Sequence, residues 1–119
     1  MAGKGLECII GMIQDPQFGP VVMFGLGGIF VEVMKDVSFR VAPLTREDIR
    51  EMIMEIKAYP LLIGYRGDPP KDVGAVQAIN GKVSEIALAY PEIQEIDLNP
   101  AVIHENGASI LNSQIILSS

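Results

Sequence analysis

Three oxygen-bearing side chains alternate along a short run near the carboxyl end of the chain: Glu95, Asp97 and Asn99. Successive side chains of a β-strand point to opposite faces, so an extended backbone would gather these three on one face. Mg²⁺ prefers oxygen ligands and retains some of its water, so this face could hold a magnesium ion. The alternative is a solvated outer face that ends in a turn at Asn99-Pro100, and spacing alone favours this alternative.

Two glycine-containing segments could bind an anion. The run Gly25-Leu26-Gly27-Gly28 could bring backbone amides close to a phosphate, because glycine has no side chain to obstruct the approach. It lacks the lysine and hydroxyl residue of a P-loop and does not match G-x-G-x-x-G, so a plain turn is the favoured interpretation of the run alone. In the loop Gly64-Tyr65-Arg66-Gly67, Arg66 could hold a phosphate or carboxylate, or could be an exposed connector residue.

The single cysteine and the single histidine do not indicate a reactive site. Cys8 has no neighbouring cation that would lower its pKa, so we expect a buried and unreactive thiol. A lone cysteine cannot form an internal disulfide, which fits a reducing compartment. We expect His104, just before the turn residues Glu105-Asn106-Gly107, to face solvent at the tip of a hairpin. The sequence therefore indicates neither a catalytic triad nor a zinc site.

The elements that would position these residues follow the order strands, helix, helix, strands. A capping box, Thr45 with Asp48, begins a helix that we expect to end at Pro60. A longer helix spans about 72–89, and its apolar stripe consists of Val76, Ile79, Val83, Ile86 and Tyr90. We expect strands at 6–13, 21–24, 39–41, 93–98, 101–103 and 108–111, the last continuing to 117, with a hairpin turn at the Asn-Gly pair. This order predicts an α+β fold in which two helices pack on one face of a largely antiparallel sheet.

Length and composition bound the class of protein. The 119 residues suit one domain, 1–119, and a hydrophobic share of 49% is sufficient for a real core. The formal net charge of −6 argues against nucleic-acid binding, which relies on basic residues to neutralise phosphates. No apolar run is long enough for a membrane span and no signal peptide is evident, so we expect a cytoplasmic protein.

Several segments together resemble a known family. They are Gly5-Leu6-Glu7, the long run 15–33, Lys35-Asp36-Val37, Ala42-Pro43-Leu44-Thr45, Gly64-Tyr65-Arg66-Gly67 and Glu95-Ile96-Asp97-Leu98-Asn99-Pro100. This set resembles the ATP-grasp β subunit of ADP-forming (NDP-forming) acetyl-CoA and acyl-CoA synthetases, from about Gly5 to Leu117. The resemblance implies the carboxyl-terminal subdomain of an ATP-grasp domain whose first half is absent here.

The resemblance also implies a reaction and its participants. In this family, acyl-CoA, ADP and phosphate exchange with free acid, CoA and ATP through a phosphohistidine on a separate CoA-binding part. The β part grips ADP or ATP with Mg²⁺ between two subdomains, of which this chain resembles the second. The implied partners are therefore a CoA-binding subunit and the missing first ATP-grasp half, and no catalytic residue is assigned to this chain.

Two asparagines take the metal-ligand positions that the resemblance implies. Asn99 matches a Mg²⁺ ligand of the family. Asn112 lies in Leu111-Asn112-Ser113-Gln114, where the family has Leu-Asp-Ala-Arg. Asn112 keeps a carbonyl oxygen but loses the negative charge, and Gln114 loses a basic group. We expect a weaker metal site than one held by carboxylates.

The positions that the resemblance assigns to nucleotide binding are Gly27, Gly28, Glu7 and Arg66. The two glycines match the family loop near the reacting phosphates. Glu7 and Arg66 match family positions too, and Arg66 has no definite role.

Two functions are compatible with these residues. The chain could be a piece of a ligase that needs a partner, which Asp97, Asn99 and the glycine run favour. It could instead be a degenerate interaction or oligomerisation module, which Asn112 and Gln114 favour. Because a severed interface would expose apolar surface, a homo-oligomer is a further possibility.

Overall fold

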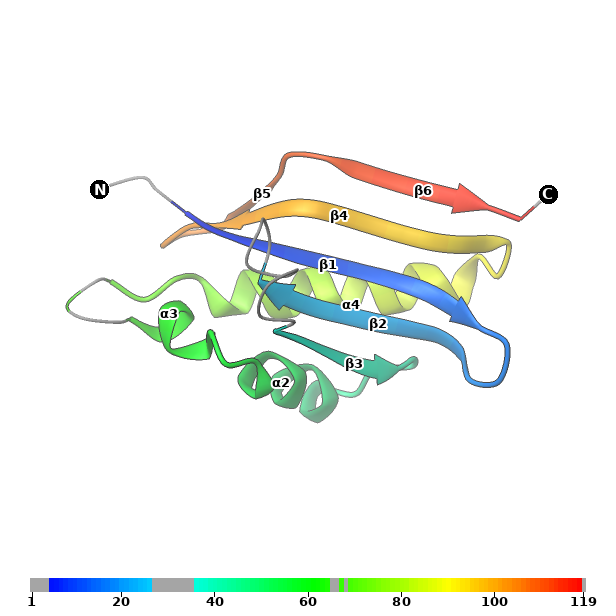
Figure 1. The fold of residues 1–119 in the computed structure, drawn as a ribbon, viewed down its shortest axis with the longest axis horizontal. Helices are drawn as coiled ribbons and strands as arrows, with labels where there is room; N and C mark the ends of the chain where they lie inside the picture. The colour runs from blue at the N-terminus through cyan, green and yellow to red at the C-terminus, as the bar shows by residue number, and fades with distance from the viewer. Residues whose placement is uncertain (1–4, 27–35, 65–66, 68, 119) are drawn as a thin grey trace.

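The computed structural model describes residues 5–26, 36–64, 67 and 69–118. Within these residues six strands form one sheet in the order β3-β2-β1-β4-β5, and β6 pairs with β4 alongside β5. Every pairing is antiparallel. In chain order the elements are β1 (Leu6–Asp15), β2 (Gly19–Leu26), β3 (Val37–Val41), α2 (Arg46–Glu55), α3 (Tyr59–Ile63), α4 (Val73–Ala89), β4 (Ile93–Ile103), β5 (Ala108–Ile110) and β6 (Ser113–Leu117) (Figure 1).

The described helices α2 and α4 lie on one face of this sheet, and the opposite face, which no described helix covers, is called the open face. Helix α4 packs against β1, β2 and β4, and α2 packs against β3 and β2 (Figure 1). The α+β fold with two main helices on a largely antiparallel sheet is therefore confirmed. In the described part of the chain, no helix has the length and apolar character needed to cross a membrane.

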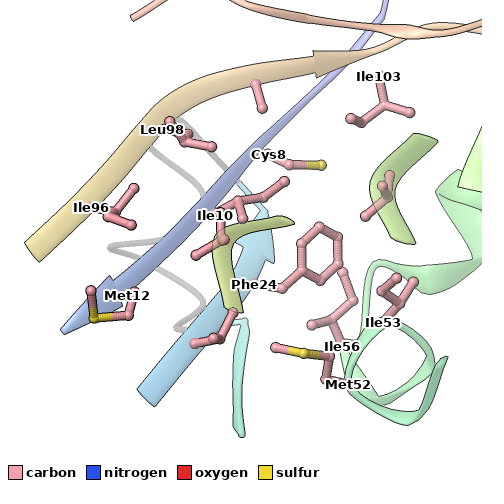
Figure 2. Close-up of a cluster of buried hydrophobic side chains, with 14 of the residues drawn as sticks. Cys8, Ile10, Met12, Phe24, Met52, Ile53, Ile56, Ile96, Leu98 and Ile103 are labelled. Atoms are coloured by element: carbon pink, nitrogen blue, oxygen red, sulfur yellow. The ribbon is translucent and has the colours of Figure 1, made fainter. Parts of the chain in front are cut away.

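The core lies between the sheet and these helices. Strand β1 contributes Cys8, Ile10 and Met12, which alternate along the strand and are fully buried. Figure 2 shows them in one cluster with Phe24 from β2 and Met52 from α2. The two-residue period of a strand places these three residues of β1 on the side of the helices, and Ile9, on the other side of β1, is also buried.

Helix α2 begins as predicted. The Asp48 amide donates to Thr45 Oγ1 at 3.0 Å, and the Thr45 amide donates to Asp48 Oδ2 at 3.0 Å, which completes the capping box. Met52 and Ile53 form its buried side. The helix ends at Glu55, before the position that the sequence indicates.

The prediction that Pro60 ends this helix is wrong, because Pro60 lies in the first turn of the next helix, α3. The carboxylate of Asp36 accepts hydrogen bonds from the amides of Lys57 and Ala58, at 2.6 and 2.8 Å. These contacts hold the chain in the bend between α2 and α3. Proline is well tolerated in a first turn, where its missing N–H would have no helical partner.

Helix α4 confirms most of its predicted stripe. Val76 and Val83 are buried, whereas the side chain of Tyr90 is 54% exposed because the helix ends one residue before it. The buried side of the helix also includes Asn80 and Ser84, whose polar character conceals them from an apolar pattern. Both are bonded: Asn80 Nδ2 donates to the Val76 carbonyl, and Ser84 Oγ accepts from an amide before α2.

The carboxyl-terminal strands divide differently from the prediction. The hairpin turn is confirmed, with Gly107 at a φ of +92° between β4 and β5. Strand β4 runs without a break where two strands were predicted, and the predicted strand 108–117 divides into β5 and β6 around Leu111 and Asn112. Asp72, the N-cap of α4, accepts from the amides of Ala75 and Gly107, so it ties the helix to the hairpin.

Candidate functional site

Strand β4 presents polar side chains on the open face of the sheet. Ile96 and Leu98 are buried, whereas Glu95 and Asn99 are exposed and Asp97 is half-buried. This alternation is the one that the sequence predicts. The open face carries the oxygen-bearing side chains because the helices require apolar contacts on the other side.

Asn99 and Asn112 lie next to each other in the structure. The backbone amide of Asn99 donates to the backbone carbonyl oxygen of Asn112 at 3.1 Å. The register of β4 with β6 continues this contact, since Leu98 lies opposite Ser113 and Asp97 lies opposite Gln114. The pairing of these strands therefore brings together both asparagines of the predicted metal site, and their role as metal ligands stays a prediction.

The glycine-rich run begins in the same row of the sheet as Asn99. Gly25 pairs with Ile9 of β1, and the two neighbours of Ile9 pair with Ala101 and Leu98 of β4. Ile9 therefore lies opposite Asn99 and Pro100, where the register between β1 and β4 shifts. Neighbouring strands lie about 4.8 Å apart, so Gly25 is roughly 10 Å from Asn99 across the sheet.

The position of Gly25 requires a glycine. A Cβ atom there would lie 2.8 Å from the backbone oxygen of Asp36 and would overlap Val37. The close approach holds β2 against the start of β3. Asp36 is 4% exposed, and its two bonds to backbone amides fix that start to the bend between α2 and α3.

Sequence reasoning missed this role of Asp36. A single charged residue before a short strand is not distinguished in the sequence from a solvated loop residue. Gly27, Gly28 and Arg66, the other predicted anion-binding positions, lie outside the residues that the structure describes.

Glu7 lies on β1 opposite Val102 of β4 and is exposed. It alternates with the buried Cys8, so it belongs to the open face, as Asp97 does. The structure thus locates Glu7 on the same face as the asparagine pair, and its role in nucleotide binding stays a prediction.

The donor set limits which ion the site could hold. In the described residues, no three His, Cys, Asp or Glu side chains come together as a metal site. A metal beside β4 would therefore depend on the amide oxygens of Asn99 and Asn112 together with the carboxylate of Asp97. Oxygen donors of this kind suit Mg²⁺ and do not suit zinc, which favours nitrogen and sulfur ligands.

The cysteine and the histidine have structural surroundings. Cys8 is buried, as the sequence predicts, and this burial raises the pKa of its thiol to about 12, which disfavours the reactive thiolate. His104 is half-buried, and its Nε2 lies 3.1 Å from Ser109 Oγ. The backbone amide of Asp72 also donates to the carbonyl oxygen of His104. These two contacts hold His104 within the hairpin, so it is not free at the hairpin tip.

Residues 1–117 match the family model of the ATP-grasp domain. The chain belongs to the ATP-grasp family. This ATP-grasp chain is 60% identical over 117 residues to the β subunit of ADP-forming acetate–CoA ligase I of Pyrococcus furiosus. The match covers 98% of this chain and 50% of that subunit. The chain is also 48% identical over 117 residues to ADP-forming acetate–CoA ligase I of Archaeoglobus fulgidus, and there it covers 17% of the longer protein.

The ATP-grasp chain also resembles a solved structure. An acetyl-coenzyme A synthetase of Ca. Korarchaeum cryptofilum, in complex with coenzyme A and Mg-AMPPCP, superposes with a TM-score of 0.93 at 50% identity. The match covers 98% of this chain and 55% of that one. This ATP-grasp chain thus spans about half the length of the β subunits and structures that it matches.

Proposed function

We propose that this chain supplies one half of the nucleotide-binding domain of an ADP-forming acyl–CoA ligase. In the proposed reaction, acyl-CoA, ADP and phosphate give the free acid, CoA and ATP. One observation carries the proposal: the backbone amide of Asn99 donates to the backbone carbonyl oxygen of Asn112, in the row where the glycine-rich run begins. The similarity to ADP-forming ligases over nearly the whole chain supports the same reaction.

The residues of this row would hold Mg·ADP or Mg·ATP. Asn99, Asn112 and Asp97 would offer oxygen ligands to Mg²⁺, which neutralises phosphate charge when bound. The amides of Gly27 and Gly28 would approach the phosphates, with Glu7 on the same face and Arg66 as a further contact. The chain's contribution is to position these groups before the reaction, so that they need little rearrangement during it.

Other chains would complete the site. The match to 50% of a β subunit supports a site that also needs a first ATP-grasp half, which would close over the open face. A CoA-binding subunit would carry the acyl chemistry. We place the assembly in the cytoplasm, in keeping with a reaction that uses ADP, phosphate and CoA.

Reconstitution tests this proposal. The chain is mixed with the first half of the Pyrococcus furiosus β subunit and with a CoA-binding subunit, and ATP formation from acetyl-CoA, ADP and phosphate is measured. We expect ATP only when all three components are present, and a loss of ATP formation with Asn99→Ala. Asn106→Ala, in the exposed hairpin turn, is the matched control and keeps the activity. ATP formation that does not require this chain would overturn the proposal.

A degenerate, non-catalytic module is the second candidate, favoured by the neutral Asn112. The variant Asn112→Asp separates the two, because a carboxylate at a genuine metal site strengthens Mg²⁺ binding. We expect Asn112→Asp to raise the Mg²⁺-dependent affinity for ADP in the reconstituted assembly. Asn106→Asp adds the same charge away from β4 and leaves the affinity unchanged. Equal affinities in both variants would mean that Asn112 is not at the metal and would favour the interaction module.

A further inference from the structure

The carboxyl-terminal strand β6 forms an unprotected edge of the sheet. Among the described strands, β6 pairs only with β4, so its other edge offers backbone donors and acceptors to a further strand. Strand β6 lies beside β4 at the margin of the sheet (Figure 1). All five of its residues are exposed, and the apolar ones lie on both faces because side chains alternate along a strand. Ile115 is 54% exposed, Ile116 is 42% exposed and Leu117 is 61% exposed.

The sequence around β6 lacks two features that commonly prevent edge pairing, charged side chains and proline. From Asn106 to Ser119 there is no charged side chain and no proline. Natural edge strands commonly carry lysine, proline or a bulge, or are covered by a helix. A neutral and apolar edge in a chain where one residue in five is charged therefore indicates an interaction surface.

The opposite edge of the same sheet is protected. Strand β3 carries Arg40, which donates to Glu55 of α2 at 2.7 Å and lies 4.0 Å from Glu51. Helix α2 also packs against β3. A charged residue and an adjacent helix thus protect the β3 edge from pairing with another strand, so the exposure of β6 is not a general property of this sheet.

We propose that two copies of the chain associate through β6, with the two strands antiparallel about a two-fold axis. A pairing centred on Ile115 sets Ile115 against its counterpart, Gln114 against Ile116, and Ser113 against Leu117. Each copy carries a net charge of −6, so most approaches between copies oppose like charges. The β6 edge carries no carboxylate side chain, so two acidic chains can pair along it without opposing such groups, and a two-fold contact uses the same patch on both copies.

Sedimentation equilibrium of the 119-residue chain tests this inference. We expect the chain to dimerise reversibly, and we expect Ile115→Lys to be monomeric because the axis would place two lysines face to face. Phe39→Lys is the matched control, since Phe39 is 51% exposed and lies on the opposite edge strand, β3. It keeps the dimer. Circular dichroism verifies that the variants are folded, and Leu117→Lys replaces Ile115→Lys if that variant does not fold.

Salt dependence adds an independent readout. Added salt screens the repulsion between two acidic chains but leaves an apolar, hydrogen-bonded edge intact. We therefore expect tighter association at higher salt. A monomeric wild-type chain at every concentration would overturn the inference and leave β6 to a different partner. A dimer that survives a folded lysine variant of β6, that dissociates with Phe39→Lys, or that weakens with salt would also overturn it.

Discussion

The two faces of the sheet are built from alternating residues of the same strands, but the helices that the structure describes cover only one of them. On the covered face, β1 presents Cys8, Ile10 and Met12, all fully buried. On the open face, the same sheet carries Glu7, Asp97 and the asparagine pair. The difference shows that strand period assigns the core side chains to one side and the exposed polar ones to the other, although Ile9 on the open face is also only 6% exposed.

Two phenylalanines on neighbouring strands give the largest expected contrast between the faces. Phe24 of β2 is fully buried, whereas Phe39 of β3 is 51% exposed on the open face. We expect Phe24→Ala to lower the free energy of unfolding by about 3–5 kcal/mol, because it leaves a cavity in the core. Phe39→Ala should cost less than about 1 kcal/mol. Urea denaturation measures both, and equal losses would show that the open face is also part of the core.

Two aspartates give a smaller contrast. Asp36 is buried, and its carboxylate accepts hydrogen bonds from the backbone amides of Lys57 and Ala58. Asp97 is half-buried on the open face. Asp36→Ala leaves two backbone amides without their hydrogen-bond acceptor, so we expect a loss of about 1–3 kcal/mol in the free energy of unfolding. Asp97→Ala should stay within about 0.5 kcal/mol, as surface substitutions usually do. Thermal or urea unfolding compares the pair, and a larger loss for Asp97→Ala would reverse the assignment of the faces.

The smallest expected effect concerns the capping box, which starts the helix that covers β3. Thr45→Ala removes the oxygen that accepts the Asp48 amide, and we expect a loss of about 1 kcal/mol in the free energy of unfolding. Hydrogen bonds from the backbone and side chain of Thr45 hold the pKa of Asp48 below its usual 3.8.

A depressed carboxyl pKa fixes the direction of the pH dependence of this cap. The stabilisation is present above pH 3.8, the value for the unfolded chain, and is lost as the pH falls through the lower value of the folded chain. Urea denaturation as a function of pH should therefore show that Asp48→Asn removes part of the acid-induced loss of stability. An unchanged acid profile in Asp48→Asn would contradict the role of the cap.

Local signals in the sequence predicted the elements well. The capping box of Thr45 and Asp48, the Asn-Gly hairpin and the stripe of α4 around Val76 each depend on residues a few positions apart. The alternation in β4 also located Asp97 and Asn99 on one face before any contact was known. These features could be predicted because their physical cause lies within one turn or one strand.

The errors arose where distant residues decide local structure. Pro60 looked like a helix end, but Asp36, more than twenty positions earlier, bends the chain so that Pro60 begins a helix. Asn99-Pro100 looked like a turn, but backbone hydrogen bonds from Asn99 to Asn112 and from Leu111 to Pro100 keep β4 continuous through it. The contact of Asn99 with Asn112 likewise depends on strand register, which the resemblance implied and spacing alone did not.

The central claim is that the open face beside β4 holds the cation of a bound nucleotide. Mn²⁺ takes oxygen ligands as Mg²⁺ does and broadens the nuclear magnetic resonance signals of nearby amides. In a titration of the chain with Mn²⁺ and ADP, the amides of Asn99 and Asn112 should broaden first. Broadening that begins at the acidic surface of α2, around Glu47 and Glu51, and spares the asparagine pair would contradict the claim.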